Sequence, residues 1–194
     1  MNTDITLYGS LVVLRSLFTA EIRSNQYKNW LIDPRVTRYM SSGQARPTDE
    51  EMFAYEKSGL LLGIFRKNSY DCRGTTDLWM GNVRLHQINT TQRVAELGIM
   101  IGDKARWGQG YATDACTVML GYAFGSMNLN RVGIGVVELN KAGLALWTKL
   151  GFKEEGRLRE AFWVDGLPRD VIRMGLLQRE WFDAHRGSGT SKTG

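Results

Sequence analysis

The stretch of sequence that decides the fold is Glu96–Ala112, which reads ELGIMIGDKARWGQGYA. It begins as an apolar strand and passes through a short polar link into the glycine-rich, basic segment Arg106–Gly110. An amphipathic helix is predicted to follow at once, over about 112–127. Glycines let a backbone curl close to a ligand, and the first N–H groups of a helix have no partner within it. The stretch therefore predicts an anion-binding site between a strand and a helix N-terminus.

The composition indicates one globular domain. The chain has 194 residues, of which 43% are hydrophobic and 23% charged, and this is enough for a sizeable core. We expect the domain to cover residues 1–185, followed by a flexible Gly/Ser/Thr-rich tail over 186–194. The sequence shows neither a signal-peptide pattern nor an apolar run of membrane-spanning length. A cytoplasmic protein that does not bind membranes is therefore expected.

Charge and cysteine content argue against two kinds of site. The formal net charge is +5, but the basic residues are scattered, so no nucleic-acid groove is predicted. A modest positive field suits a polyanionic small ligand. The chain has two cysteines, Cys72 and Cys116, and two histidines, so no metal site is expected. Cys116 falls in the apolar helix after the loop and is predicted to be a core residue.

Local signals give the order of the other elements. A capping box formed by Thr48 and Glu51 predicts a helix start, Asn140 is a good N-cap, and Gly151 is a good residue to follow a helix end. Thr19 is predicted to cap a helix that Asp33 and Pro34 end. The expected strands are 7–17, 61–66, 76–85, 94–101 and 131–139, with a closing hairpin of 152–164 and 169–177. The expected helices, besides that after the loop, are 20–32, 49–58 and 142–150, and 35–47 is expected to be irregular.

This order predicts a mixed α/β (α+β) fold, in which helices cover the faces of a mixed sheet. The segment from Val94 to Leu139 forms a strand–helix–strand unit, which should be a right-handed parallel crossover. Asp165 and Gly166 are typical of the turn of a tight hairpin, and they join the last two strands.

Three motifs follow one another along the chain. They are Ala95–Gly98, Arg106–Ala112, and the segment from Asn140 through Lys149–Phe152. Together they resemble the GNAT acetyltransferase superfamily, and most of all its ribosomal-protein-type (RimJ/RimL-like) branch. The resemblance runs from about Leu7 to Trp181 and thins between 33 and 60. It implies a central mixed, splayed sheet of about seven strands with about four helices, and acetyl-CoA inserted in the gap.

The resemblance also implies which residues hold acetyl-CoA. The pantetheine arm would pair with the backbone of one strand segment, made of Gly98, Ile99, Met100 and Ile101. The diphosphate would meet the loop that carries the Arg/Gln-x-x-Gly-x-Gly/Ala pattern, made of Arg106, Trp107, Gly108, Gln109, Gly110, Tyr111 and Ala112. Asn140 would reach the pantetheine or the thioester. Trp147 is predicted to pack against the cofactor or the core, and Tyr111 to form a wall of the site or part of the core.

Glu96 is the predicted catalytic base. Acetyl transfer needs a neutral amine, and several family members place a carboxylate at this strand to remove its proton through water. The alternative is a structural Glu paired with a surface Arg or with the turn at Arg93. No general acid is assigned, because Trp147 and Gly143 stand where family members often carry Tyr and Ser. A strand N–H is the expected oxyanion donor, and His86 is interpreted as structural or exposed.

The leading hypothesis is an acetyl-CoA-dependent N-acetyltransferase that works by direct transfer in a ternary complex. The acceptor would be a protein N-terminus or a small amine such as a nucleotide-linked amino sugar, with Arg38, Tyr39, Arg46 and Trp163 as candidate lining residues. The alternative is a non-catalytic acyl-CoA-binding module. A dinucleotide-binding oxidoreductase is disfavoured, because no acidic residue follows at the ribose position. The protein is expected to be a monomer or a homodimer.

Overall fold

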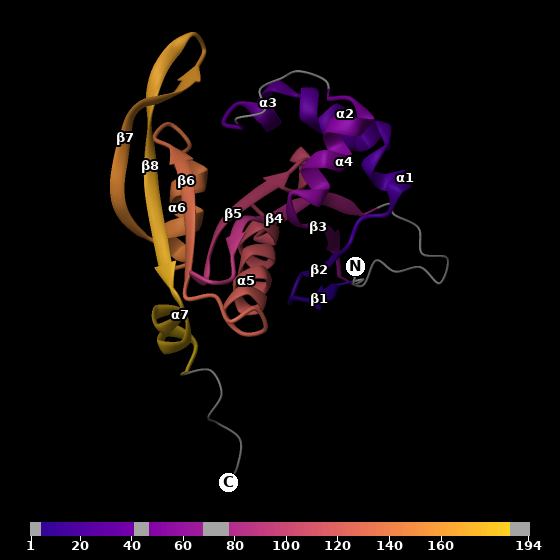
Figure 1. Cartoon of the computed structure of the whole chain (residues 1–194). Helices are drawn as coiled ribbons and strands as arrows, with labels where there is room; N and C mark the ends of the chain where they lie inside the picture. The colour runs from indigo at the N-terminus through magenta and orange to yellow at the C-terminus, as the bar shows by residue number, and fades with distance from the viewer. Residues whose placement is uncertain (1–4, 41–46, 68–77, 187–194) are drawn as a thin grey trace.

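The computed structural model describes residues 5–40, 47–67 and 78–186. These residues form one eight-stranded sheet in the order β1-β2-β3-β4-β5-β6-β8-β7 (Figure 1). The strands are β1 Thr6–Tyr8, β2 Val12–Arg15, β3 Gly59–Arg66, β4 Trp79–Asn89, β5 Val94–Ile101, β6 Arg131–Val137, β7 Lys153–Val164 and β8 Leu167–Leu177. The helices are α1 Thr19–Ile22, α2 Asn25–Ile32, α3 Pro34–Thr37, α4 Asp49–Lys57, α5 Tyr111–Phe124, α6 Lys141–Lys149 and α7 Gln178–His185, besides a 3₁₀ turn at Lys104–Arg106.

The predicted mixed α/β fold is confirmed. The pair β5 and β6 is parallel, as the crossover predicted, and the other neighbouring strands in the sheet are antiparallel. The described residues hold eight strands and seven α-helices, against about seven and about four expected. Both differences come from short elements that the sequence patterns merged or missed.

Two hydrophobic cores cover the two faces of the sheet. The first core joins Leu97 and Ile134 to α5, α6 and α7, and it contains the buried Cys116. Burial raises the pKa of the Cys116 thiol, which keeps it protonated. The second core joins Met100 to α1, α2 and α4 and includes Trp30 packed edge-on against Trp79, with ring centroids 4.9 Å apart. Figure 1 shows α1, α2 and α4 grouped together and α5 on the other side.

The first predicted strand is wrong in its extent, because the chain turns within it. Gly9 donates its N–H to the carbonyl of Val12 and separates β1 from β2. The carboxylate of Asp114 in α5 accepts from the backbone N–H groups of Ser10, Leu11 and Val12, at 2.7 to 3.1 Å. A partner about a hundred residues away in the chain therefore fixes this turn, and no local pattern announces it.

The first predicted helix is also wrong in its extent. Ser24 accepts a hydrogen bond from the N–H of Tyr27 and starts α2 as a separate helix after α1. Asp33 ends α2, as predicted, but its carboxylate also caps the short α3 within the segment expected to be irregular. The sequence patterns did not predict α7, which packs Trp181 into the first core.

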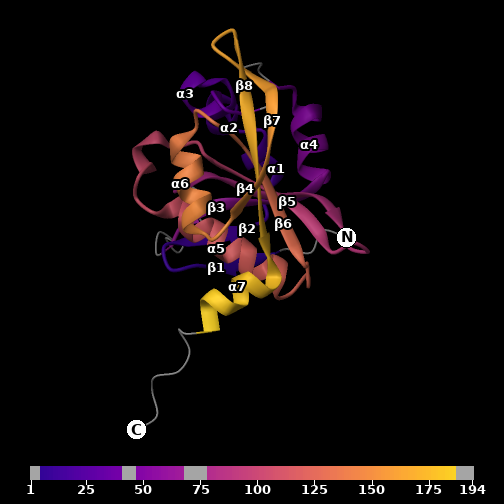
Figure 2. The ribbon, with the colours of Figure 1, turned by 90° about the vertical axis from the view of Figure 1, so that its left-hand side faces the viewer.

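The strongest local signals are confirmed. Thr48 and Glu51 form the predicted capping box of α4. Asn140 caps α6, and Gly151 adopts a left-handed φ of 91° just after that helix. Asp165 and Gly166 both have positive φ and connect β7 to β8 in a tight hairpin, which projects beyond the rest of the sheet (Figure 2). The stretch between the predicted strands 61–66 and 76–85 lies almost wholly outside the described residues, and so does the predicted tail of 186–194 except for Arg186. Cys72 and Arg46 lie outside them too. None of the helices in the described ranges combines the length and apolarity that crossing a membrane requires.

Candidate functional site

The sheet is splayed between β5 and β6. These strands pair only at Val94, Ala95 and Glu96, which face 131–133 of β6. Beyond Glu96, β5 stays with β4 while β6 follows β8, and Figure 1 shows the two strands diverging. Within the described part of the chain, the backbone groups of 97–101 that face β6 therefore have no partner strand. Buried backbone groups need partners. The resulting V-shaped opening is the feature that the resemblance implied.

A glycine turn and an uncapped helix N-terminus lie beside the open end of this V. Gly108 and Gly110 have φ values of 73° and 85°, which L side chains rarely adopt. Among the residues that the structure describes, no side chain caps the N-terminus of α5, and the first backbone bond of the helix runs from Asp114 N–H to the carbonyl of Gly110. Its first N–H groups are thus left for a ligand, and the helix dipole favours an anion there.

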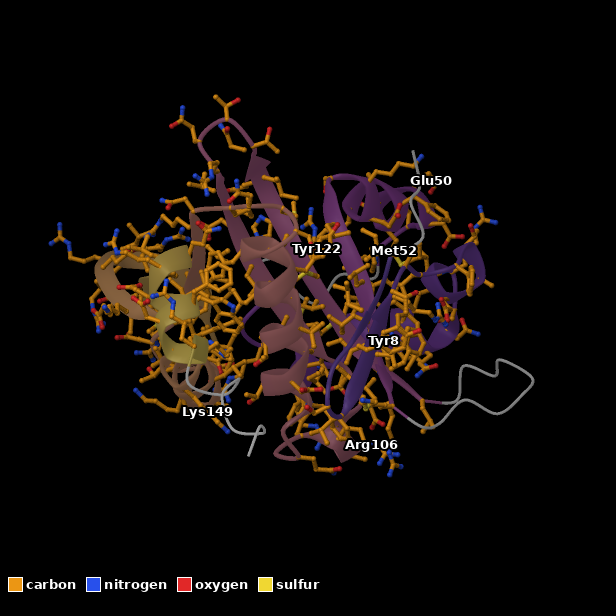
Figure 3. The ribbon with its side chains drawn as sticks, turned by 90° about the horizontal axis from the view of Figure 1, so that it is seen from below. Tyr8, Glu50, Met52, Arg106, Tyr122 and Lys149 are labelled. Atoms are coloured by element: carbon orange, nitrogen blue, oxygen red, sulfur yellow. The ribbon has the colours of Figure 1, made fainter. Side chains whose placement is uncertain are left out.

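The side chains of the loop hold it against β5. The indole N–H of Trp107 donates to the carbonyl of Ile101 at 2.8 Å, while the ring stays 44% exposed. Gln109 donates to the carbonyl of Ala105 at 2.6 Å. Arg106 lies 3.4 Å from the Asp103 carboxylate. Figure 3 shows Arg106 near one end of α5 and Tyr122 near the other. A basic side chain, a half-exposed indole and free helical N–H groups thus come together at one place.

The start of α6 explains why Gly143 stands where family members often carry a serine. The side chain of Asn140 accepts from the N–H of Gly143 at 2.9 Å, so its oxygen serves the helix cap. A Cβ at 143 would lie 2.7 Å from Asn140 Nδ2, so a serine there would displace this cap. Trp147 is buried in the first core, packed edge-on against Phe152. Tyr111 is buried in the same core. Contact of Asn140, Trp147 or Tyr111 with a cofactor stays a prediction.

Glu96 lies at the closed end of the V and forms an ion pair with Arg173 of β8. The carboxylate is 19% exposed, and its Oε1 lies 2.7 Å from where a Cβ of Gly133 would stand. A glycine at 133 therefore makes room for this ion pair. The sequence left open that Glu96 is structural and pairs with an arginine. The structure shows such a pair, which Glu96 forms with Arg173 and not with Arg93. The ion pair fixes where the carboxylate points, and its catalytic role stays a proposal.

Two positions of β4 across from Glu96 and Gly98 were not predicted as site residues, and from the sequence His86 is interpreted as structural or exposed. His86 stands directly opposite Glu96 in the β4–β5 ladder, and Arg84 stands opposite Gly98. All four positions lie on the sheet face of Met100, because Leu85 and Leu97 between them point into the first core. Burial and the charge of Arg84 hold the pKa of His86 below its usual range, so its imidazole is neutral near pH 7. In the sequence of β4, polar residues alternate with buried apolar ones, and this alternation could have indicated that Arg84 and His86 share one face of the sheet.

The segment directly after α3, Arg38 and Tyr39, contacts the part of the sheet that lies beyond the V, on the side of β6, β7 and β8. Tyr39 donates its hydroxyl to the carbonyl of Leu139 at 3.3 Å, and Arg38 pairs with Asp165 at the tip of the hairpin, at 2.6 Å. These contacts join the α2–α3 region to the β6 side of the V. Trp163, another candidate lining residue, is 68% exposed on the hairpin.

Comparisons with known proteins agree with this geometry. A family model described as the acetyltransferase (GNAT) domain matches residues 12–153. The putative ribosomal N-acetyltransferase YdaF of Bacillus subtilis is 37% identical over 101 residues, which are 52% of this chain and 55% of the relative. The spermidine N(1)-acetyltransferase of Escherichia coli strain K12 is 34% identical over 109 residues, 56% of this chain and 58% of the relative. The chain thus spans somewhat more than half the length of each of these two relatives.

A solved structure shows the same fold. The spermidine N-acetyltransferase of Vibrio cholerae, in complex with CoA and spermine, superposes with a TM-score of 0.77 and 24% identity. The match covers 89% of this chain and 99% of that structure. The family model matches most of the chain, and the splayed sheet is the fold that this family implies. The chain belongs to the GNAT acetyltransferases.

Proposed function

We propose that the protein moves an acetyl group from acetyl-CoA to a primary amine, by direct transfer in a ternary complex. The observation that carries the proposal is the splay of β5 from β6 next to the uncapped N-terminus of α5. An open strand edge suits the amides of a pantetheine arm, and the helix end suits a diphosphate. Members of the family use acetyl-CoA, and the neighbouring Vibrio cholerae structure holds CoA.

The donor would lie along β5 and the glycine loop. Its pantetheine amides would pair with the free backbone edge of Gly98–Ile101, which the sheet leaves without a partner strand. Its diphosphate would meet the N–H groups of 107–112 and the side chain of Arg106. Cys116, the one cysteine within the described residues, is fully buried with its thiol protonated, so it offers no acyl-enzyme nucleophile. This supports direct transfer.

The chemistry of the transfer needs an acceptor amine without its proton. The neutral amine nitrogen forms a bond to the acetyl carbon, the carbon–sulfur bond breaks so that CoA leaves as its thiolate, and the nitrogen gives up one proton. The Glu96 carboxylate is the proposed base, held in place by Arg173. The neutral imidazole of His86, one strand away, would take the proton onward through water. A backbone N–H of β5 would stabilise the developing oxyanion.

Release of free CoA from acetyl-CoA tests this function. The purified protein is given acetyl-CoA and a panel of primary amines, including an N-terminal peptide, amino sugars and spermidine, and the free thiol is measured. We expect thiol release and N-acetylated product with at least one class of amine. The absence of turnover with every amine would contradict the proposal.

A non-catalytic acyl-CoA-binding module is the second candidate function. The pairing of Glu96 with Arg173 and the lack of a hydroxyl at Gly143 favour it, because both weaken the usual catalytic set. Calorimetry separates the two functions, since a binding module would take up acetyl-CoA without any turnover.

The substitution Gly110→Ala tests the donor site. An alanine at φ 85° strains the backbone by about 1–2 kcal/mol, while its Cβ would only touch Leu11 at an ordinary 3.5 Å. We expect the loop to shift and CoA to bind about tenfold more weakly in calorimetry. Gly156→Ala is the matched control, because its Cβ would meet nothing within 4 Å and its φ is unstrained. Equal CoA affinity in Gly110→Ala and the wild type would rule out this loop as the anion site.

A further inference from the structure

We propose that the acceptor is a primary amine on an unbranched carbon, a CH₂–NH₂ group, and that Gly98 of β5 selects it by keeping open a slot one side chain wide. The slot is the space over Gly98 and Gly135 on the sheet face opposite the first core. The inference rests on the proposed acetyl transfer and names its substrate class. It comes from the three successive levels of the V on this face, of which the middle one is open.

The paired part of β5 and β6 shows which residues lie level with one another across the V. The last pair is Glu96 with Gly133. Two residues further along each strand stand Gly98 and Gly135. Because the residue between the members of each strand belongs to the first core, all four point to the opposite face of the sheet. On this face the V therefore has a glycine on each of its sides, directly beyond Glu96.

The levels before and after these two glycines are filled by side chains. Before them, Glu96 forms its ion pair with Arg173. After them stand Met100 of β5 and Val137 of β6, which are 9% and 4% exposed. Met100 is covered because it belongs to the second core, with residues of α2 and α4. An approach to the V from this face is therefore blocked both at the level of Glu96 and at that of Met100.

The chain from Trp30 to Tyr39 closes the open end of the V on this face. The indole of Trp30 packs on Gly102, directly after β5, so closely that a Cβ at 102 would overlap it. At the other end of the same stretch, Tyr39 donates its hydroxyl to the carbonyl of Leu139, just after β6. One continuous segment thus spans from the end of β5 to the end of β6. A ligand on this face is left with the level of the two glycines.

The level of the two glycines is open. A Cβ at Gly98 would meet nothing within 4 Å among the described residues. Gly135 is exposed although it lies in an inner strand, and it is bordered by Arg173 and Val171 of β8, at 3.0 and 3.3 Å from where its Cβ would stand. Glycine is a poor strand former, and a glycine inside a strand often marks a place where a ligand comes close. The vacancy over Gly98 therefore suits the acceptor, which must come next to Glu96.

The length of the slot decides which amines fit. Side chains on one face of a strand stand about 7 Å apart, so the slot between Glu96 and Met100 has room for a single side chain. A CH₂–NH₂ group is as thin as the end of a lysine side chain and can enter end-on, with its nitrogen beside Glu96. An amine on a branched carbon, as in an amino sugar or at most protein N-termini, brings a second substituent to the same place. The slot therefore favours the unbranched amine.

Isomeric amines test the substrate class. Butylamine is compared with 2-aminobutane, which differs only in the branch next to the nitrogen. A peptide that begins with glycine is likewise compared with one that begins with alanine. We expect kcat/KM to be about tenfold or more higher for the unbranched member of each pair. Equal values in either pair, or a preference for the branched member, would overturn the inference, whereas no turnover with any amine would contradict the proposed function itself.

The substitutions Gly98→Ala and Gly98→Val test the slot itself. The added methyl group would take the place of the carbon that carries the amine, so kcat/KM for butylamine should fall about tenfold or more in Gly98→Ala, and further in Gly98→Val. CoA affinity in calorimetry should stay within about twofold, because the backbone edge of β5 is kept. The melting temperature should not fall, because alanine and valine are both better strand formers than glycine.

Gly156→Ala in β7 is the matched control for Gly98→Ala. A Cβ at 156 also meets nothing within 4 Å among the described residues, and the residue lies outside the V, so kcat/KM should stay unchanged. An unchanged kcat/KM in Gly98→Ala would overturn the role of Gly98. A loss of activity that is matched by an equal loss of CoA affinity, or that comes with a lower melting temperature, would overturn it too, since it would assign the effect to the donor site or to the fold.

Discussion

Glu96→Gln is expected to lower kcat by about a hundredfold, the range in which a positioned general base contributes. Glutamine keeps the size of the side chain but does not accept a proton at neutral pH, so the acceptor amine would keep its proton longer. The KM for acetyl-CoA should change little, because the glycine loop before α5 is untouched. The measurement is the pH–rate profile with a good acceptor, for the wild type and the variant.

Glu155→Gln is the matched control for Glu96→Gln. Glu155 of β7 forms the same kind of ion pair with Arg131 of β6, across the intervening strand β8. Its substitution breaks an arginine–glutamate pair without touching the V, so kcat should stay within about twofold of the wild type. A pH–rate profile that is unchanged in Glu96→Gln would rule out Glu96 as the base. Equal losses in both variants would assign the effect to the ion pairs and not to proton transfer.

Gly81→Ala is expected to destabilise the fold strongly. A Cβ at 81 would overlap the carbonyl oxygen of Met100 and lie 2.8 Å from the Cα of Ile101. Both neighbours are backbone atoms of β5, which cannot rotate away as a side chain can. The β4–β5 ladder would have to open, at a cost of about 3 kcal/mol or more. Thermal unfolding should show a melting temperature lower by about 10 °C, or little folded protein.

Gly121→Ala is the control for Gly81→Ala, with the opposite sign. Gly121 lies within α5, and its Cβ would meet nothing within 4 Å. Alanine is favoured over glycine in a helix interior by about 1 kcal/mol, so the melting temperature should rise by about 2–4 °C. Similar melting temperatures for Gly81→Ala and the wild type would show that β4 and β5 are not packed this closely.

Local sequence determined the elements whose signals are complete within a few residues. The Thr48–Glu51 capping box, the Asn140 cap and the Asp165–Gly166 turn are of this kind, since each satisfies backbone groups a few residues away. The strand–glycine loop–helix stretch of 96–112 is another. It predicted an anion site at the start of α5, and the structure shows the glycine turn and the uncapped helix end there, because these features need no distant partner.

Tertiary structure decided the features whose partners are distant in the chain. The β1–β2 turn depends on Asp114, and Arg173 holds Glu96 from 77 residues away. The sequence predicted a carboxylate at this strand, but which arginine neutralises it depends on the β6–β8 register. His86 stands opposite Glu96 only through the β4–β5 register, which no local pattern sets.

The sequence by itself therefore determined the fold class and the family, because the motifs behind them rest on short-range backbone chemistry. Only the tertiary structure decided the balance of charge around Glu96. Pairing across β6 neutralises Glu96 of β5 with Arg173 of β8. The charge that a pocket offers to a ligand depends on which side chains are already paired, and that is a property of strand register and not of sequence spacing.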